Sequence, residues 1–376
     1  MAVSEKSTMV RPQLDPEFLE ILGPIAPLVS RPDISEVMVM GDRDVYIEVN
    51  GVVELTDIKF ASEPDLVKTI EAIVHSVGRD IGPDQPLCDA RLPDGSRVHV
   101  AVRPVAVDGP MLTIRKFVEG PDQPETMVRI GTASLEVMAY MRLAVEAKAN
   151  IVITGGTAVG KTTLLNVVSG FIPEGERIVT IEDAAELHLH QRHVGRLETM
   201  TATTGGRNPV SIRDLVITSL RMRPDRIVVG ECRGSEALDM MQAMNTGHDG
   251  SLTTIHANSP RDALSRIENM VLMAGYDIPV KAIRGQMAAA FDVFIHLDRM
   301  RDGSRRIVQV VEITGMEGDV VSMQDLFRFE FRGFDENGMV LGRIAPTQVR
   351  SRVVDEARAT GVPIPPELLK LYPPPR

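Results

Sequence analysis

Residues 151–163 have the sequence IVITGGTAVGKTT, in which an apolar run, a glycine-rich turn and the start of a helical pattern follow one another. Residues 155–162 match the phosphate-binding loop pattern G-x-x-x-x-G-K-[ST]. A P-loop connects a β-strand to an α-helix, and this stretch lies between a strand expected at 151–154 and a helix expected at 161–170. Backbone N–H groups of such a loop converge on phosphate oxygens at a helix N-terminus. We therefore predict a P-loop for ATP that consists of Gly155, Gly156, Thr157, Ala158, Val159, Gly160, Lys161, Thr162 and Thr163.

Two side chains of this loop carry the chemistry. Lys161 is expected to bind the β- and γ-phosphates, and the hydroxyl of Thr162 is expected to ligate Mg²⁺. ATP and Mg²⁺ are thus the predicted cofactors. A P-loop alone is compatible with a kinase, a GTPase, a helicase or a secretion motor, because it indicates phosphate binding and nothing further.

Three polar residues follow apolar, strand-like runs further along the chain. The run IVVG at 227–230 ends at Glu231, the position from which a carboxylate can align water on the γ-phosphate. The runs RIVTI and SLTTI end at Glu182 and His256. Parallel sheets bind ligands outside the carboxyl ends of their strands, so these side chains should converge on the nucleotide. Glu231 is the predicted catalytic base, and Glu182 and His256 are predicted to position water or metal, with Glu182 as a further metal ligand.

The arrangement of strand and helix patterns predicts two domains. Alternating strands and helices beyond residue 133 predict an α/β domain with a parallel sheet. Hairpins at Asn50-Gly51 and Pro93-Asp94-Gly95, with a helix expected at 63–77, predict a small α+β domain before it. The expected boundaries are an N-terminal extension at 1–30, the α+β domain at 31–117, a linker at 118–132, the ATPase domain with a C-terminal β-rich subregion at 133–345, and a C-terminal tail at 346–376. Within the tail, the stretch PIPPELLKLYPPPR at 363–376 is expected to be extended and mobile.

Composition excludes several classes of protein. The formal net charge is −11 and aromatic residues make up 4% without any Trp, which disfavours nucleic acid as a general partner. No apolar run approaches the roughly 18 residues of a membrane-spanning helix, so we expect a cytoplasmic protein without direct membrane insertion. Cys88 and Cys232 lie far apart and match no zinc spacing, so reduced, buried thiols are expected.

Four segments in order carry a resemblance to a known family. GGTAVGKTT, TIEDAAEL, LRMRPDRIVVGECRGSEA and GHDGSLTTIHANSP resemble the Walker A, Asp, Walker B and His boxes of the secretion ATPase superfamily of type II and type IV secretion and type IV pilus motors. The resemblance extends to DARLPDGSRVH and IRKF upstream. The chain is most similar to the tight-adherence (Flp/Tad) pilus assembly branch, the CpaF type. Absence of a four-cysteine zinc element disfavours the type II secretion branch.

The resemblance implies a homohexamer of RecA-like domains, each preceded by an α+β domain that closes over ATP. Arginines of that N-terminal domain reach the γ-phosphate in such motors, and Arg91, Arg97 and Arg115 occupy the matching stretches. A second basic group is expected to bind phosphate or carboxylates of a neighbouring subunit: Arg207, Arg213, Arg221, Arg223 and Arg233.

The function expected from these features is an ATP-hydrolysing motor, peripheral at the inner face of the cytoplasmic membrane. It would power pilus assembly or retraction, or protein secretion, through a polytopic inner-membrane platform protein. A conjugation-type DNA-transfer ATPase is the main alternative. A small-molecule kinase would need an acceptor pocket and a lid, and a catalytically inactive scaffold would not need Lys161, Thr162 and Glu231 together.

Overall fold

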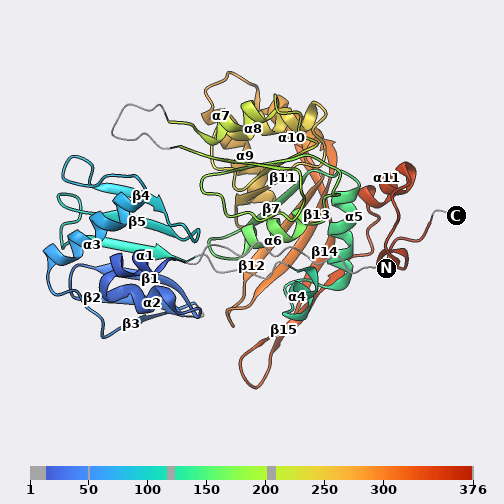
Figure 1. Ribbon diagram of the computed structural model, residues 1–376. Helices are drawn as coiled ribbons and strands as arrows, with labels where there is room; N and C mark the ends of the chain where they lie inside the picture. The colour runs from blue at the N-terminus through green and yellow to red at the C-terminus, as the bar shows by residue number, and fades with distance from the viewer. Residues whose placement is uncertain (1–13, 50, 117–122, 201–208, 375–376) are drawn as a thin grey trace, which may run out of the picture. The chain divides into compact units, whose positions relative to one another are not determined.

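The computed structural model describes residues 14–49, 51–116, 123–200 and 209–374, which form two compact units (Figure 1). Described residues up to Lys116 belong to the first unit, and those from Gln123 belong to the second. The predicted turn residue Asn50 and the predicted basic residue Arg207 lie outside the described residues.

The first unit is built on a six-stranded antiparallel sheet in the order β3-β2-β1-β6-β5-β4. Its strands are β1 (Ile34–Met40), β2 (Asp44–Val49), β3 (Val52–Leu55), β4 (Leu87–Arg91), β5 (Arg97–Ala101) and β6 (Met111–Arg115). Helix α3 (Glu63–Ser76) begins after Ser62, whose side chain accepts a hydrogen bond from the Asp65 N–H. This helix buries one apolar stripe in the core of the unit, namely Leu66, Ile70, Ile73 and Val74.

The predicted N-terminal extension is wrong for residues 14–30. This segment forms α1 (Pro16–Ile21), a 3-10 turn η1 (Gly23–Ile25) and α2 (Ala26–Ser30). Phe18, Leu22, Ile25 and Leu28 are buried in the same core as α3. Because each helix has only five or six residues, the apolar period was too short to indicate a helix, although burial of its side chains stabilises it.

The second unit contains a nine-stranded mixed sheet in the order β15-β14-β13-β12-β7-β11-β10-β8-β9. The parallel strands are β7 (Ile151–Gly155), β8 (Ile178–Glu182), β9 (Val194–Glu198), β10 (Arg226–Val229), β11 (Leu252–His256) and β12 (Val293–Arg299). Nearly continuous burial of β7, β8, β10 and β11 accounts for their unbroken apolar sequences, since helices cover both faces of this part of the sheet.

Two hydrophobic cores lie on the two faces of this sheet. One core contains residues of α5 (Leu135–Glu146) and α6 (Lys161–Ser169). The other contains residues of α7 (Ile212–Ser219), α8 (Glu236–Asn245), α9 (Pro260–Met273) and α10 (Val280–Ala290). Cys88, in the first unit, and Cys232, in this one, are buried free thiols, as expected.

The predicted β-rich subregion continues the main sheet. Strands β13 (Arg305–Glu317), β14 (Val320–Phe334) and β15 (Val340–Pro346) pair antiparallel and extend from β12. The sequences VVSM at 320–323 and FRFEF at 327–331 belong to the single long strand β14. Within the predicted linker, residues 124–129 form helix α4 (Pro124–Arg129), and its Met127 is buried in the core beneath α5.

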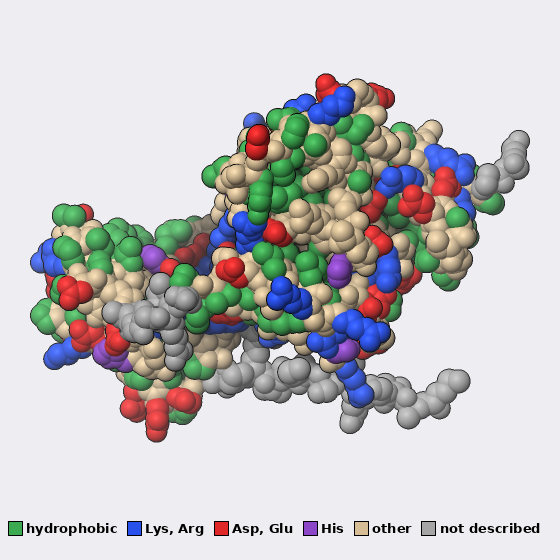
Figure 2. Space-filling view, turned by 90° about the horizontal axis from the view of Figure 1, so that it is seen from above, with side chains coloured by type: hydrophobic (Ala, Val, Ile, Leu, Met, Phe, Trp, Pro, Cys, Tyr) green, Lys and Arg blue, Asp and Glu red, His purple; other side chains and the backbone are tan. Residues whose placement is uncertain are grey.

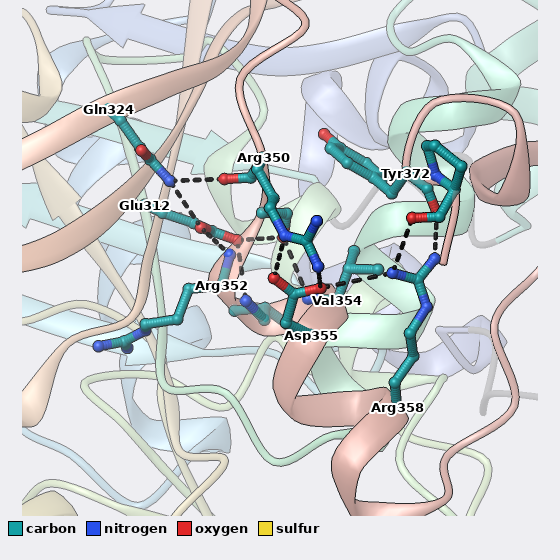
Figure 3. A network of polar contacts seen from close by, with 11 residues as sticks. Glu312, Gln324, Arg350, Arg352, Val354, Asp355, Arg358 and Tyr372 are labelled. Carbon is teal, nitrogen blue, oxygen red and sulfur yellow. Dashed lines mark hydrogen bonds and ion pairs between the residues drawn. The ribbon is translucent and has the colours of Figure 1, made fainter. Parts of the chain in front are cut away.

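The prediction of an extended, mobile C-terminal tail is wrong. Helices α11 (Arg352–Thr360) and α12 (Pro366–Leu369) pack against the second unit with Val353, Val354, Ala357 and Leu368 buried. Figure 3 shows the polar network that fixes this segment around Glu312 of β13. The Glu312 carboxylate, which is 0% exposed, accepts hydrogen bonds from the Tyr140 hydroxyl at 2.7 Å, the Arg352 N–H at 2.8 Å and the Ser351 hydroxyl at 2.5 Å. Proline residues suggested an extended tail, but burial of these apolar side chains stabilises a helix between them.

Among the described residues, no helix is both long enough and apolar enough to cross a membrane.

Candidate nucleotide-binding site

The glycine-rich loop connects β7 to α6 with the geometry of an anion-binding turn. All five residues of β7 are buried, and α6 begins at Lys161. Gly160 is the N-cap residue and adopts a left-handed conformation with φ 96°. A glycine there has no side chain that could cap the helix, so the N–H groups of the first turn remain available to an anion.

Close packing explains the glycine at the start of the loop. A Cβ atom at Gly155 would lie 2.6 Å from the Leu297 carbonyl oxygen and 2.7 Å from a methyl group of Val159. At the end of the loop, the Lys161 ammonium donates a hydrogen bond to the Gly156 carbonyl oxygen at 2.7 Å, so it lies over the loop. Partial burial lowers the pKa of Lys161, while the nearby Glu231 carboxylate raises it.

The sheet topology brings the predicted site residues to one edge. Strand β11 lies between β7 and β10, and β8 follows β10, all in parallel. His256 is paired with Gly155, and Ile181, which precedes Glu182, is paired with Val229. Glu182 and His256 are therefore the last residues of β8 and β11, and Glu231 follows β10 by two residues, at the same edge of the sheet as the P-loop. Their chemical roles stay predictions.

Glu182 is a buried carboxylate with one satisfied oxygen. Its Oε1 accepts hydrogen bonds from the N–H groups of Glu186 at 2.8 Å and Leu187 at 2.9 Å. Its Oε2 is buried and has no hydrogen-bond partner among the described residues. Burial raises the pKa of Glu182 to about 7, although the two backbone hydrogen bonds act in the opposite direction. A carboxylate with an unsatisfied, buried oxygen is suited to bind a cation or a water molecule.

Glu231 is held by an arginine. The Arg233 guanidinium donates to Glu231 Oε2 at 2.6 Å, and its other terminal nitrogen lies 3.2 Å from Asp183 Oδ2. The hydrogen bond to Glu231 is the main reason that the pKa of Arg233 is raised. Arg233 thus links the ends of β8 and β10 at the edge where the phosphates are expected.

His256 is partly buried at the end of β11 and has no hydrogen-bond or ion-pair partner within the described ranges. The backbone on either side of it is fixed: the Ala257 N–H donates to the Gly155 carbonyl oxygen at 3.3 Å, and the Thr254 hydroxyl donates to the Gly230 carbonyl oxygen at 2.8 Å. The ring is therefore positioned by the sheet and is available to a ligand.

Two residues of this region were not identified from the sequence. His296 of β12 is 6% exposed, and its Nδ1 lies 2.9 Å from the Thr154 hydroxyl, one residue before the P-loop. Burial lowers the pKa of His296. Arg266 of α9 lies close enough to Lys161 to lower its pKa. His296 could have been identified from the sequence, because a histidine within the apolar run VFIHL indicates a buried polar side chain. The position of Arg266 depends on how α9 packs and is not visible in the sequence.

The residues present fit a magnesium nucleotide. The loop offers backbone donors and Lys161 to phosphate, and the Thr162 hydroxyl and the unsatisfied Glu182 oxygen are hard oxygen ligands of the kind that Mg²⁺ prefers. Thr162 and Glu182 would hold the metal, which would neutralise phosphate charge when bound.

In the first unit, the three predicted arginines form a row across neighbouring strands. Arg91 of β4 is paired with Arg97 of β5, and Arg97 is paired with Arg115 of β6, which is paired in turn with Glu36 of β1. Directly paired residues point to the same face of a sheet, so the three guanidinium groups lie on one face, with the Glu36 carboxylate beside Arg115.

The second basic group is not a single cluster. Arg213 forms an ion pair with Asp239 at 2.7 Å and a hydrogen bond with the Tyr276 hydroxyl, so it is satisfied within its own chain. Arg233 lies at the site described above. Arg221 and Arg223 are exposed in the turn before β10. The five arginines were predicted to share one role, binding phosphate or a neighbouring subunit. Arg213 instead contacts residues of its own chain, because folding separates arginines that are close in the sequence.

A parallel α/β sheet with a glycine loop and acidic residues at the ends of adjacent strands defines a P-loop nucleotide-binding protein. The type II/IV secretion system protein family matches residues 19–322, and the chain belongs to this family.

Individual proteins share this similarity over most of their length. A putative conjugal transfer protein of Mycobacterium tuberculosis is 34% identical over 304 residues, which cover 79% of this chain and 86% of that protein. The type IV secretion system protein PtlH of Bordetella pertussis is 33% identical over 323 residues, or 79% of this chain and 94% of that protein. Neither similarity singles out the CpaF type.

Solved structures show the same fold. The ATPase DotB of Legionella pneumophila aligns with a TM-score of 0.53 and 20% identity, over 80% of this chain and 82% of that chain. The pilus retraction motor PilT, solved with ADP, aligns with a TM-score of 0.53 and 16% identity, over 90% of this chain and 86% of that chain.

Proposed function

We propose that this protein is a Mg²⁺-dependent ATPase that powers transport or filament assembly by a secretion or pilus system. The observation that carries the proposal is the position of Glu182, Glu231 and His256 on strand ends beside a P-loop that contains Lys161 and Thr162. Family membership supports it.

Each residue has a distinct part in the proposed hydrolysis. Lys161 binds the β- and γ-phosphates, and Glu231 accepts a proton from the attacking water and aligns it on the γ-phosphate. Arg233 donates to Glu231 Oε2 at 2.6 Å, and in the proposed cycle its guanidinium turns toward phosphate as Glu231 takes the proton of the water. Glu182 binds Mg²⁺ or its water, and His256 contacts the γ-phosphate.

We propose that the arginine row of the first unit converts ATP binding and hydrolysis into movement of that unit. Guanidinium groups of Arg91, Arg97 and Arg115 would bind the γ-phosphate by charge-assisted hydrogen bonds and release it after hydrolysis. In a hexamer, this binding would close each N-terminal domain over ATP and open it again. A stable monomer with full activity would contradict this part of the proposal.

We propose a membrane platform protein as the partner and a protein or pilin subunit as the cargo. The net charge of −11 opposes general binding to a phosphate backbone. On the face shown in Figure 2, acidic and basic side chains are interspersed. The conjugal transfer names of some relatives favour DNA transfer as the second candidate.

The catalytic proposal is tested by separating binding from turnover. Lys161→Ala should weaken ATP binding, whereas Glu231→Gln should bind ATP and lose turnover by about 100-fold or more, because phosphate contacts survive and water alignment does not. His256→Ala should lower turnover without a shift of more than a few degrees in melting temperature. Turnover of Glu231→Gln at the wild-type rate would show that the base is another residue.

The partner is tested with ATPase rates measured at two salt concentrations. The assays contain a detergent-solubilised platform protein, single-stranded DNA, double-stranded DNA or no addition. The platform protein should stimulate turnover several-fold. Stimulation by DNA that declines steeply with salt, without any effect of the platform protein, would favour the DNA-transfer function instead.

A further inference from the structure

Arg305, at the start of β13, lies against the P-loop from the side opposite Glu231. The strand order β13-β12-β7-β11-β10 places β12 and β13 on one side of β7, the strand before the P-loop, and β11 and β10 on the other. A Cβ atom at Gly160, the N-cap of α6, would lie 3.6 Å from Arg305 Cδ. The last carbons of this side chain therefore contact the turn from which α6 starts.

The strand pattern explains why Arg305 faces the loop. Leu297 of β12 is paired with Ile307 of β13, and both are buried in the core that contains α6. Side chains two residues apart on a strand point to the same face. Arg299 and Arg305 are the next pair along these strands on that face. They consequently extend past the buried core toward the end of β7 where the loop begins.

The charge of this pair is not balanced within the described residues. Arg299 and Arg305 are directly paired, both are exposed, and their guanidinium groups have no hydrogen-bond or ion-pair partner in the described part of the chain. Like charges that are directly paired across antiparallel strands are destabilising. A Cβ atom at Gly303 would lie 4.0 Å from the Arg299 guanidinium, so this side chain points toward the turn between β12 and β13. Arg305 is therefore the arginine of the pair that contacts the P-loop.

The neighbouring Arg306 has a different environment. Its guanidinium donates to the Ser304 hydroxyl at 3.2 Å and the Gly131 carbonyl oxygen at 3.3 Å, and it lies over the Phe329 ring. Arg306 therefore holds the turn in place by contacts within the domain. Arg305, on the opposite face, has no such structural contact among the described residues.

We propose that Arg305 is a further nucleotide-binding residue, whose guanidinium pairs with the α- and β-phosphates of the nucleotide in the P-loop. This inference rests on the proposed function, since it adds a ligand to the same site. Because Arg305 approaches from the side away from Glu231, Glu182 and His256, it contacts phosphates that ATP and ADP share. It strengthens the binding of both nucleotides and does not take part in γ-phosphate cleavage.

The test measures Mg-ADP and Mg-ATP binding by titration calorimetry, with Glu231→Gln as the background for ATP so that hydrolysis does not interfere. Arg305→Ala should raise Kd about tenfold for both nucleotides, and Arg305→Lys should recover part of the loss, because a charge-assisted contact is removed or weakened. In the hydrolysis assay, Arg305→Ala should raise KM while kcat at saturating ATP stays within about twofold of wild type.

Arg301→Ala is the matched control, since Arg301 is an exposed arginine of the same turn that precedes β13. It should leave Kd within twofold of wild type. Equal Kd values for Arg305→Ala and wild type would overturn the inference, and so would an equal loss in Arg301→Ala, which would indicate a general field effect. If the unmodified protein binds no nucleotide, or binds it independently of Lys161, the proposed function itself fails.

Discussion

Gly230 lies directly against the side chain of Glu182. A Cβ atom at Gly230 would approach Glu182 Cγ to 2.9 Å and Oε1 to 3.5 Å. The Gly230 N–H also donates to the carbonyl oxygen of Ile181, the residue before Glu182, at 2.8 Å. Gly230, which precedes Glu231, therefore leaves space for the buried Glu182 carboxylate at the end of the adjacent strand. A change at Gly230 should consequently affect the positions of both predicted catalytic acids.

Gly230→Ala should displace Glu182 and reduce ATP turnover at least tenfold. The added methyl group overlaps Cγ, so Oε1 must leave its two backbone donors or the strands must separate. Overpacking of this kind costs about 1–3 kcal/mol of unfolding free energy. Gly195→Ala on β9 is the control, because its Cβ would lie 3.8 Å from Val179 in ordinary contact. Steady-state kinetics with unchanged turnover in Gly230→Ala would exclude a strict positional requirement for Glu182.

Stability should depend on the protonation of Glu182 between pH 4.5 and about 7. Its pKa rises from the model-compound value of 4.5 to about 7 on folding, so the native state binds more protons than the unfolded state in this range. The unfolding free energy of the wild type should therefore fall as pH rises, by up to roughly 3 kcal/mol relative to Glu182→Gln. Urea unfolding at several pH values measures this difference. Glu174→Gln, which removes an exposed carboxylate, controls for net charge, and a pH-independent difference between wild type and Glu182→Gln would contradict the prediction.

The sequence predicted the site better than the ends of the chain. The P-loop, Glu182, Glu231 and His256 follow strands whose apolar runs were unambiguous, and the parallel order then brings these strand ends together. The positions of His296 and Arg305 depend on which strand is adjacent to β7, and residue spacing does not contain that information. Helices α1, α2 and α11 are short and are stabilised by tertiary burial more than by local propensity, so their patterns were weak.

Glu312 should be the residue that most stabilises the C-terminal segment. Glu312→Ala leaves the Tyr140 hydroxyl and the Arg352 N–H without their acceptor, and we expect a loss of about 3 kcal/mol or more in unfolding free energy. Tyr140→Phe removes a single hydrogen bond and should cost about 1 kcal/mol. Chemical denaturation gives both values, and limited proteolysis of Glu312→Ala should cleave first within residues 347–374. Removal of residues 347–376 with no change in melting temperature would mean that the packed segment contributes nothing to stability.

The hydrogen bond between His296 and Thr154 should connect the strand before the P-loop to β12, and a double-mutant cycle can measure it. Thr154→Val and His296→Phe each remove one partner of the 2.9 Å contact while they retain much of the volume. We expect a coupling free energy of about 1 kcal/mol from the two single variants and the double variant, because residues in direct hydrogen-bond contact are not additive. Burial lowers the pKa of His296, so the native state binds fewer protons than the unfolded state near pH 6.5. The unfolding free energy of the wild type should therefore fall relative to that of His296→Phe as the pH decreases through the ordinary histidine pKa of about 6.5. Thr154→Val combined with Tyr140→Phe provides the control pair, since Tyr140 bonds to Glu312 and not to this contact. Additivity of Thr154→Val and His296→Phe within about 0.3 kcal/mol would show that the two side chains are neighbours without energetic coupling.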